Sequence, residues 1–350
     1  MSIRQWKAAV CQTEPCWLDK TAGVAKTIQL IREAKENCAA LIAFSETWLP
    51  GYPLFLWSNA YMDNLSLVQR YIQNSITAQG PEMLAIRRTA AECQMYVSLG
   101  FSERDGASLY IAQVLIGPDG NVLLHRRKLK PTHVERTIFG DATGDSVNSV
   151  VATPLGKIGM LNCWEHLQPL LKYHAYSQGE EVHIAAWPNN RVECTAEPWT
   201  LSMQASVLMA SQFYALEGQT FVLAANYPIT QEGRDKNTPE TTDKTKTWKR
   251  AVGGGAASVY GPDGRRLTEP TDHQYDGLIY CDIDLDKIYE AKTLADPVGH
   301  YSRPDLLRLL VDDQPKNHVV RLNEMGTPLP ARTLLSQHRP LDALLEAKDS

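Results

Sequence analysis

Long apolar runs are missing from this sequence of 350 residues. The clearest one covers residues 38–44, whereas a helix needs about 20 apolar residues to cross the hydrocarbon core of a bilayer. The first ten residues also lack the long apolar core of a secretion signal. We therefore expect a soluble protein that has no membrane span and is located in the cytoplasm.

Closely spaced cysteine and histidine pairs are missing too. The 7 cysteines are widely spaced and include no Cys-x-x-Cys, and none of the 9 histidines forms His-Glu-x-x-His or another compact pair. A disulfide framework, a structural zinc site and a catalytic metal centre are therefore not expected. A reducing compartment is the simplest setting for these cysteines.

The sequence has no excess of positive charge. Lysine and arginine number 35 against 40 aspartates and glutamates, and a net charge of −5 makes general nucleic-acid binding a poor candidate function. Residues 253–255 are three glycines without the Lys-Ser/Thr of a P-loop, and no Gly-x-Ser-x-Gly elbow occurs. What is present is an ordinary globular mixture, 43% hydrophobic and 21% charged, which excludes disorder over most of the chain.

Short apolar segments alternate with amphipathic ones along the first two thirds of the chain. This alternation indicates an α/β or layered α+β architecture. The polar segment 231–250 is expected to be an exposed loop. Strands are predicted over 7–12, 39–44, 95–101, 110–116, 121–125, 157–162, 182–187 and 220–226, and helices around 24–31 and over 81–93, 167–177 and 199–217.

One four-residue sequence, Gly-Pro-Asp-Gly, occurs at 117–120 and again at 261–264, each time between strand-like segments. Proline at the second position and glycine at the fourth suit a type I turn. The repeat indicates either an internal duplication or a common turn that is used twice. Beyond Pro297 the periodicity weakens and prolines break the chain into short pieces, so this tail is either disordered or packed on a neighbouring subunit.

Ionisable residues follow directly on two predicted strands, at the edge where open α/β sheets place their ligands. Cys163 comes after 157–162, and a thiol near a helix N-terminus is favoured in its reactive thiolate form; a buried, inert cysteine is the alternative. Glu46 comes after 39–44, and desolvation there would raise its pKa and suit it as a base; a solvated glutamate is the alternative.

A basic run at 125–130 supplies a third candidate. In an alternating strand, Arg126, Lys128 and Lys130 would share one side. A buried lysine near a cysteine and a glutamate would stabilise developing negative charge, and Glu135 could neutralise it. A solvated basic face is the alternative, and the residues by themselves leave both lysines open. His166, His174 and His183 are expected to be surface residues or satisfied core residues.

Three separated segments closely resemble the signature segments of the nitrilases, in the carbon–nitrogen hydrolase superfamily. The resemblance covers roughly residues 7–313 and implies a pseudo-duplicated four-layer α-β-β-α sandwich. It implies one domain over 1–313 and a tail over 314–350 that is disordered or makes oligomer contacts. The three segments, in the family's order, are FSETWLPGYP (44–53), HRRKLKPTHVERTIFGD (125–141) and GMLNCWEHLQPLLK (159–172).

The resemblance assigns catalytic roles to four residues. The family's essential cysteine falls on Cys163, its glutamate on Glu46 and its second glutamate on Glu135. Its lysine falls on Lys128, because the seven-residue interval to Glu135 matches the family better than the interval from Lys130 does. Two departures are Ser45, where proline is usual, and the pair at 189–190, where a small residue is common.

The Trp164 that directly follows the cysteine is similar to true nitrilases rather than to amidases. The implied reaction converts an organic nitrile and water to a carboxylic acid and ammonia through a covalent cysteine thioimidate and thioester, without a metal or organic cofactor. Trp164, Tyr52 and Trp187 are expected to form the walls of the substrate pocket.

Three other functions stay open on the same scaffold: an amidase, a cyanide-hydrolysing enzyme and, least favoured, a non-catalytic assembly protein. The expected partners are a small-molecule nitrile and further copies of this chain. Such copies would form dimers that can extend into a helical filament, as the family does. Neither nucleic acid nor membrane is an expected partner.

Overall fold

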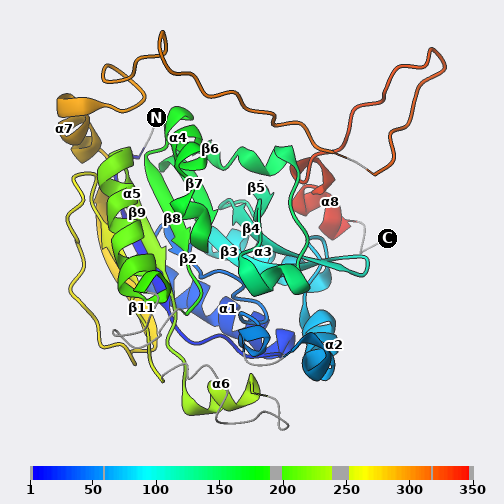
Figure 1. Cartoon of the computed structure of the whole chain (residues 1–350). Helices are drawn as coiled ribbons and strands as arrows, with labels where there is room; N and C mark the ends of the chain where they lie inside the picture. Colours follow the sequence, from blue (N-terminus) through cyan, green and yellow to red (C-terminus); the bar gives the residue numbers. More distant parts are fainter. Residues whose placement is uncertain (1–2, 58–59, 190–198, 239–251, 317, 347–350) are drawn as a thin grey trace.

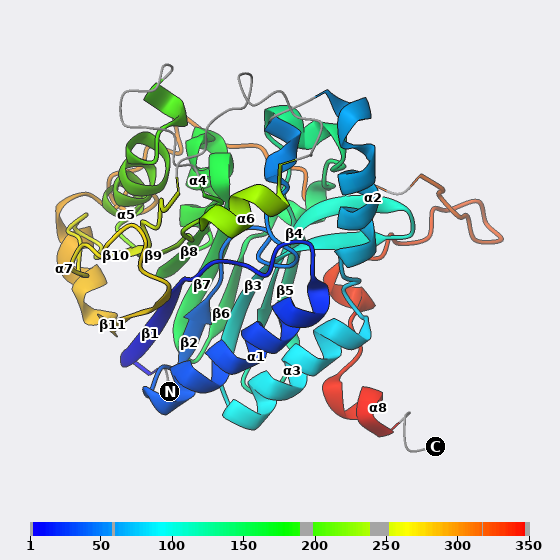
Figure 2. The same ribbon diagram turned by 90° about the horizontal axis from the view of Figure 1, so that it is seen from below.

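The computed structural model describes residues 3–57, 60–189, 199–238, 252–316 and 318–346. Two β-sheets face each other at the centre of this described part. Helices α1 (Lys20–Glu36) and α3 (Pro81–Cys93) cover the outer face of the first sheet, and α4 (Pro169–Ser177) and α5 (Ser211–Gly218) cover the second (Figures 1 and 2). This arrangement is the α-β-β-α sandwich that the sequence predicts.

Both sheets are mixed, with three parallel strands in the middle and antiparallel strands at the edges. In the first sheet, β1, β2 and β3 are parallel, and in the second β7, β8 and β9 are parallel. The order in the first sheet is β11 (Gly277–Asp284), β1 (Gln5–Gln12), β2 (Leu41–Ala43), β3 (Tyr96–Asp105), β4 (Ser108–Ile116) and β5 (Val122–Arg127). The order in the second sheet is β10 (Ser258–Tyr260), β9 (Phe221–Ala225), β8 (Val182–Ala186), β7 (Gly156–Asn162) and β6 (Val150–Thr153).

The two halves of the chain repeat one plan. Each half has three parallel strands joined by helices, and an antiparallel strand then follows the third one, β4 after β3 and β10 after β9. One Gly-Pro-Asp-Gly turn follows β4 and the other follows β10. The repeat therefore stands at equivalent places, which favours duplication over a turn that is merely used twice.

The core lies in three layers. Side chains of both sheets interdigitate between them, while α1 and α3 pack on one outer face and α4 and α5 on the other. Local signals start and end these helices: Asp19 caps α1 by accepting from Ala22 N, and Pro81 occupies the first turn of α3. The catalytic candidates emerge where strands of the two sheets end.

Two predicted elements differ from the structure. The helix expected over 199–217 consists of η6 (Trp199–Leu201), a π-helix η7 (Gln204–Ala210) and α5. The loop expected over 231–250 begins with a helix, α6 (Gln231–Lys236), because Thr230 caps it by accepting from Gly233 N. Residues 239–251 lie outside the described part.

Short helices occupy the remaining connections. Among the described residues, no helix combines the length and the apolar character that crossing a bilayer requires. The short helices are η1 (Leu54–Trp57), η2 (Tyr61–Asn64), α2 (Leu65–Asn74), η3 (His133–Thr137), η4 (Gly144–Val147), η5 (Cys163–Leu167), α7 (Asp286–Ala295), η8 (Leu335–Gln337) and α8 (Leu341–Glu346).

After α7 the chain leaves the sandwich, and the described part of 297–333 runs as an extended segment around and beyond it (Figure 1). Its end returns to the first half of the chain. Leu341 is buried and its N–H donates to Asn121 Oδ1, and His338 Nε2 lies 3.1 Å from His125 Nδ1 on β5. The end of the tail is therefore packed on its own chain.

Candidate active site

Three connections from the two sheets meet at one place. Glu46 follows β2, Lys128 follows β5 and Cys163 follows β7. Lys128 Nζ donates to Glu46 Oε1 and to Glu135 Oε2, 2.8 Å in each case. The thiol of Cys163 and one oxygen of each glutamate all lie within 4.8 Å of one another. All four side chains are buried, so the structure brings together the four residues that the sequence singles out.

The backbone turns sharply beside each of these groups. Thr47, His133 and Cys163 adopt left-handed conformations with φ of 47°, 48° and 47°. A residue with a Cβ takes this conformation at a cost of roughly 1–2 kcal/mol, and such residues concentrate at functional sites. At Cys163 the cost is offset by the turn that follows, which a buried carboxylate holds.

That carboxylate belongs to Glu165, which bonds both sheets together. Arg126 on β5 donates two hydrogen bonds to Glu165, of 2.7 and 2.8 Å. Glu165 also accepts from the backbone N–H groups of Leu129 and Asn162, 2.9 Å each. Burial opposes its ionisation, but Arg126 and these N–H groups outweigh burial and hold the pKa of Glu165 below its ordinary value. One side chain thus fixes the backbone beside Lys128 relative to the backbone before Cys163.

Glu46 has the opposite character. Burial raises its pKa to about 8, although Lys128 opposes that shift. Its Oε1 accepts from Lys128, while its Oε2 is buried and accepts no hydrogen bond from any described residue. The expected desolvation of Glu46 is therefore present, and one oxygen is free to take a proton.

The state of Cys163 differs from the expectation that a helix N-terminus favours its thiolate. Burial, followed by the charge of Glu46, raises the pKa of the thiol well above its ordinary value, and Lys128 only partly compensates. The helix that begins there, η5, has only 5 residues and so offers little dipole. The resting thiol is protonated, and a base must remove its proton before it can attack.

Lys128 is held as an ammonium group. Burial works against its charge, but Glu135 and Glu46 outweigh burial and raise the pKa of Lys128 well above its ordinary value. Glu135 is itself fixed by Thr132 N–H at 2.6 Å and by the hydroxyl of Tyr52 at 2.9 Å. Tyr52, predicted as a pocket wall, therefore orients a carboxylate of the site.

The two glutamates and Cys163 also have the spacing of a metal site. However, the ammonium of Lys128 bridges the two carboxylates, so a metal ion there would lie against a positive charge. The donor set therefore suits an internal ion pair rather than a bound metal.

The neighbouring lysine lies elsewhere. β5 ends at Arg127, so the alternation expected to bring Lys130 to the same side does not continue. Lys130 is exposed and pairs with Asp141 at 2.6 Å on the surface. The residues alone leave both lysines open as the buried one. In the structure, Lys128 is buried and Lys130 is not.

The predicted pocket residues have different surroundings. Trp164 is half-buried and lines a cavity of about 540 Å³, whose lining includes none of the four candidate residues. Trp187 is fully buried, donates to Ser211 Oγ and stacks on a histidine ring, as a core residue does. The cavity beside Trp164 is lined by Leu129, Lys130, Pro131, Thr132, His133, Arg136, Trp164, Glu165, Gln168, Leu170 and Leu171.

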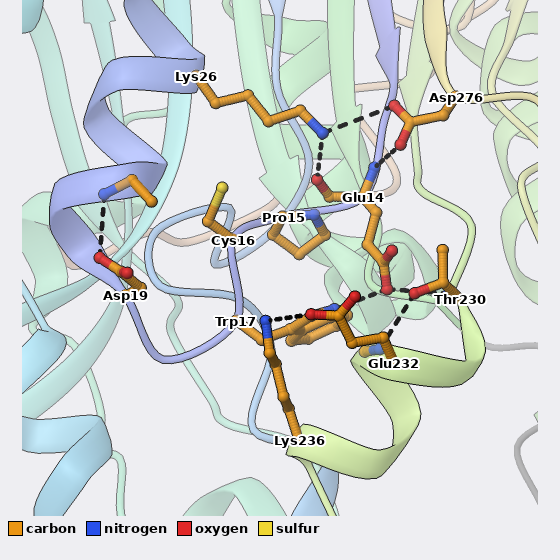
Figure 3. Close-up of a pocket in the computed structure, with 12 residues that line it drawn as sticks. Glu14, Pro15, Cys16, Trp17, Asp19, Lys26, Thr230, Glu232, Lys236 and Asp276 are labelled. Atoms are coloured by element: carbon orange, nitrogen blue, oxygen red, sulfur yellow. Dashed lines mark hydrogen bonds and ion pairs between the residues drawn. The ribbon is translucent and has the colours of Figure 1, made fainter.

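A smaller cavity of about 230 Å³ lies between α1 and α6 (Figure 3). None of the four candidate residues lines it. Its charges are satisfied internally: Lys26 pairs with Asp276 at 3.6 Å, Lys236 pairs with Glu232 at 2.8 Å, and Glu14 accepts from Trp17 Nε1. The charged groups of this cavity are therefore paired with one another, and a free cysteine, Cys16, also lines it.

The sequence matches known proteins over most of its length. A model of the carbon–nitrogen hydrolase family matches residues 7–293. The chain belongs to the carbon–nitrogen hydrolase family. This hydrolase is 46% identical to an arylacetonitrilase of Aspergillus kawachii, over 90% of this chain and 94% of that protein. It is 42% identical to a cyanide hydratase of Botryotinia fuckeliana (97% and 92%), and 43% identical to a nitrilase of Talaromyces marneffei (91% and 98%).

Solved structures support the same fold. The hydrolase resembles the carbon–nitrogen hydrolase of Helicobacter pylori with a TM-score of 0.66 and 17% identity, over 86% of this chain and 96% of that one. It resembles a member of the nitrilase superfamily from Saccharomyces cerevisiae, Nit3, with a TM-score of 0.61 and 15% identity, over 83% and 94%. At these identities the likeness concerns the fold alone, and it confirms the predicted sandwich.

Sequence reasoning missed two groups around the site. One is the pairing of Arg126 with Glu165, although both residues stand inside the quoted signature segments. The other is a contact between the buried rings of His166 and His183, which were expected only as surface or satisfied core residues. The available signal was that Glu165 and His166 are polar and closely follow Cys163. Their partners, Arg126 and His183, cannot be predicted from sequence spacing.

Proposed function

We propose that this carbon–nitrogen hydrolase is a nitrilase, which converts an organic nitrile and water to a carboxylic acid and ammonia. The observation that carries the proposal is a buried thiol on Cys163 within 4.8 Å of the Glu46 and Glu135 carboxylates, with the Lys128 side chain between the two glutamates. Relatives named arylacetonitrilase and nitrilase, 43–46% identical over nearly the whole chain, support nitriles as the substrate class.

The first half of the proposed reaction forms a thioimidate. Oε2 of Glu46 removes the proton from Cys163, and the sulfur attacks the nitrile carbon. As the C–S bond forms, one π bond of the nitrile breaks and its nitrogen takes the proton back from Glu46. The buried setting makes this step feasible, because a carboxylate with a raised pKa of about 8 is a stronger base than an exposed one.

The second half releases the two products. A water that Glu46 deprotonates adds to the thioimidate carbon, and the ammonium of Lys128 stabilises the tetrahedral species. Its nitrogen leaves as ammonia and a thioester remains on Cys163. A second water then attacks the thioester, which frees the carboxylic acid and returns the thiol. Glu135 holds Lys128 in place through its 2.8 Å contact.

The proposal is tested by ammonia release from aliphatic, aryl and arylacetonitriles and from the matching amides, with Cys163→Ala as control. We expect turnover of nitriles that the variant loses. Turnover of amides alone would move the protein to the amidases. Activity that survives Cys163→Ala would overturn the assignment of the nucleophile.

Hydrolysis of cyanide is the second candidate, because several relatives are named cyanide hydratase, at 42–45% identity. Hydration of hydrogen cyanide ends at formamide, whereas the full nitrilase reaction releases ammonia. Formamide formed from cyanide, with no ammonia from larger nitriles, would select this candidate instead.

We propose that Trp164 forms a wall of the pocket for the nitrile substituent, since it directly follows the nucleophile in the chain and lines the cavity of about 540 Å³. Tyr52 contributes to the site through its hydrogen bond to Glu135. A pocket role for Trp187 stays a prediction, and its contacts, which are those of a core residue, do not support it. Replacement of Trp164 by alanine should raise KM for aryl and arylaceto substrates more than for small aliphatic ones. An equal change for all nitriles would exclude this role.

We also propose that residues 1–313 form one catalytic domain and that 314–350 help dimers to assemble into larger, filament-forming oligomers in the cytoplasm. Exposed apolar side chains on the extended segment, such as Val319, Leu322 and Met325, support this role. Truncation after Asp313 should lower the sedimentation coefficient while the folded domain persists. An unchanged sedimentation coefficient would show that the tail does not take part in assembly.

A further inference from the structure

A line of three buried side chains leads away from the backbone of Cys163. The carbonyl oxygen of Cys163 lies 2.6 Å from His166 Nδ1. His166 Nε2 lies 2.9 Å from His183 Nε2, and His183 Nδ1 lies 2.6 Å from Glu180 Oε1. The three side chains are at most 2% exposed. We refer to His166, His183 and Glu180 as the histidine chain.

The surrounding residues are shaped to hold the histidine chain. A Cβ on Gly159 of β7 would overlap the carboxylate of Glu180, so the glycine makes the room that this group occupies. Tyr214 donates to Glu180 Oε2 at 2.7 Å, and its ring stacks on His183 with centroids 3.8 Å apart. The other face is closed by Trp187, which stacks on His166 at 4.8 Å. The chain is therefore a built polar network within an apolar layer.

Counting protons fixes the state of the histidine chain. A carbonyl oxygen only accepts, so His166 Nδ1 must carry a proton. The contact between the two Nε2 atoms needs one proton, and so does the contact between His183 Nδ1 and Glu180. Three contacts thus hold three protons, one more than two neutral imidazoles supply.

The three protons make the group as a whole neutral. Either one imidazole is an imidazolium beside the Glu180 carboxylate, or both are neutral beside a carboxylic acid; the total charge is zero in each case. Both states leave His166 as a donor to Cys163. A fourth proton is opposed, since burial and the neighbouring His183 place the pKa of His166 well below its ordinary value.

We propose that the histidine chain positions the nucleophile: the shared protons keep His166 Nδ1–H aimed at the carbonyl of Cys163, and this bond holds the left-handed turn that directs the thiol toward Glu46. The inference rests on the proposed function, because it takes Cys163 as the nucleophile. Its effect belongs to kcat, since a displacement of about 1 Å at a reacting group can cost about 100-fold in rate.

A simpler reading is that the two histidines merely fill the core. The two readings rank substitutions of His166 in opposite orders. Phenylalanine keeps the stack on Trp187 but has no N–H, whereas asparagine places an amide N–H near the position of Nδ1 but fills less space. If positioning is the role, His166→Asn retains more kcat than His166→Phe. If His166 only fills space in the core, His166→Phe retains more kcat than His166→Asn.

Substitutions of Glu180 test the proton count. In Glu180→Gln the amide N–H can donate to His183 Nδ1 while its carbonyl accepts from Tyr214, so all three protons remain in place. Glu180→Met has a similar volume and offers neither group. We expect kcat of Glu180→Gln to exceed that of Glu180→Met by about 10-fold or more, with KM of both near that of the wild type. Equal losses would show that the carboxylate charge matters and not the protons.

Tyr176→Phe is the matched control. It removes another buried hydroxyl, on α4, which donates to Glu217 at 2.8 Å and forms no hydrogen bond with the histidine chain, while the phenylalanine ring keeps the packing of Tyr176 on Tyr214. Its kcat should stay close to that of the wild type. If it falls as far as in His166→Phe, general loosening of this layer explains both losses and the positioning role is overturned.

The complete experiment measures kcat, KM and thermal midpoint for the six proteins: wild type, the two His166 variants, the two Glu180 variants and Tyr176→Phe. His166→Phe should lose about 10- to 100-fold in kcat with little change in KM, and His166→Asn should lose less. The reverse order would overturn the proposal. If His166→Phe fails to fold, the Glu180 pair decides. Activity of Cys163→Ala would instead refute the proposed function, whatever the histidine variants do.

Discussion

Arg126 and Lys128 lie two residues apart at the end of β5, and each meets a buried glutamate, yet the two pairings are built differently. Arg126 and Glu165 form two parallel hydrogen bonds, and backbone N–H groups fill the remaining places on the carboxylate. Lys128 divides its donors between two glutamates and leaves one oxygen of Glu46 without a described partner. The pKa of Glu165 is lowered, while that of Glu46 is raised to about 8.

Burial is almost the same for the two carboxylates, so burial cannot explain the difference. The neighbouring charges and the hydrogen bonds to the charged form do. Arg126 and four short hydrogen bonds stabilise the anion of Glu165, whereas Glu46 shares Lys128 with the like charge of Glu135 and accepts one hydrogen bond. A fully satisfied pair holds the backbone in place, and a partly satisfied one retains the capacity to exchange a proton. Substitutions can separate these two properties.

The largest effect is expected for Glu46→Gln. The amide cannot take the thiol proton, and general-base catalysis contributes about 10²–10⁴-fold to rates. We therefore expect kcat to fall by about 10²–10⁴-fold relative to the wild type. The unfolding free energy should rise at neutral pH, because Glu46 is ionised in the unfolded chain and must bind a proton on folding, whereas glutamine has no such requirement. Stopped assays for kcat and urea titrations measure the two quantities. If the variant keeps the activity and the stability of the wild type, Glu46 is not the general base.

The second effect concerns stability and is expected for Glu165→Gln. This change leaves Arg126 charged and buried without its counterion, which should lower the unfolding free energy by about 3–5 kcal/mol. A joint replacement, Arg126→Leu with Glu165→Met, should recover part of that loss, since two apolar groups need no partner. Urea unfolding provides the measurement, and a loss no smaller in the double variant would contradict the comparison.

A smaller effect is expected for Gly100→Ala on β3. A Cβ there would overlap the carbonyl oxygen of Ser45 and lie 3.1 Å from Glu46 Cα, so the turn that carries Glu46 must shift. We expect a loss of about 1–3 kcal/mol in stability and a clear drop in kcat. Gly106→Ala is the control, because nothing lies within 4 Å of its added Cβ and only its left-handed φ of 61° is strained. Equal kcat in the two variants would show that the turn adapts.

The last prediction is a dependence of stability on pH. The folded-state pKa of Glu46, about 8, lies above its ordinary value of 4.5, so the unfolded chain loses this proton first. The stability that Glu46 contributes is present below about pH 4.5 and is lost as the pH rises through 8. The unfolding free energy of the wild type, relative to Glu46→Gln, should therefore decline across that interval. Parallel curves for the two proteins would indicate an ordinary pKa.

The sequence was informative where chemistry follows directly on an apolar strand. Glu46 and Cys163 could be found because each stands at the end of a run that can only be a buried strand. The layered fold followed from the alternation of elements, and the signature segments identified the family. These signals are local patterns, which can be detected in a single sequence.

What could not be predicted depends on contacts between distant segments. The residues by themselves leave Lys128 and Lys130 open and only the resemblance selects Lys128; the physical reason, that β5 ends at Arg127, comes from the structure. The protonated state of Cys163 depends on Glu46, which comes from the other sheet. The histidine chain joins η5 to β8, and no spacing in the sequence reports a contact between two imidazole rings.

The position of β11 has a consequence for folding. This strand belongs to the second half of the chain, yet it pairs antiparallel with β1 over the full length of both strands. The first half therefore cannot complete its sheet by itself, because β1 without β11 would present a bare strand edge. The repeated halves are interlocked rather than independent, so we expect them to melt in one transition and a fragment that ends before β11 to aggregate.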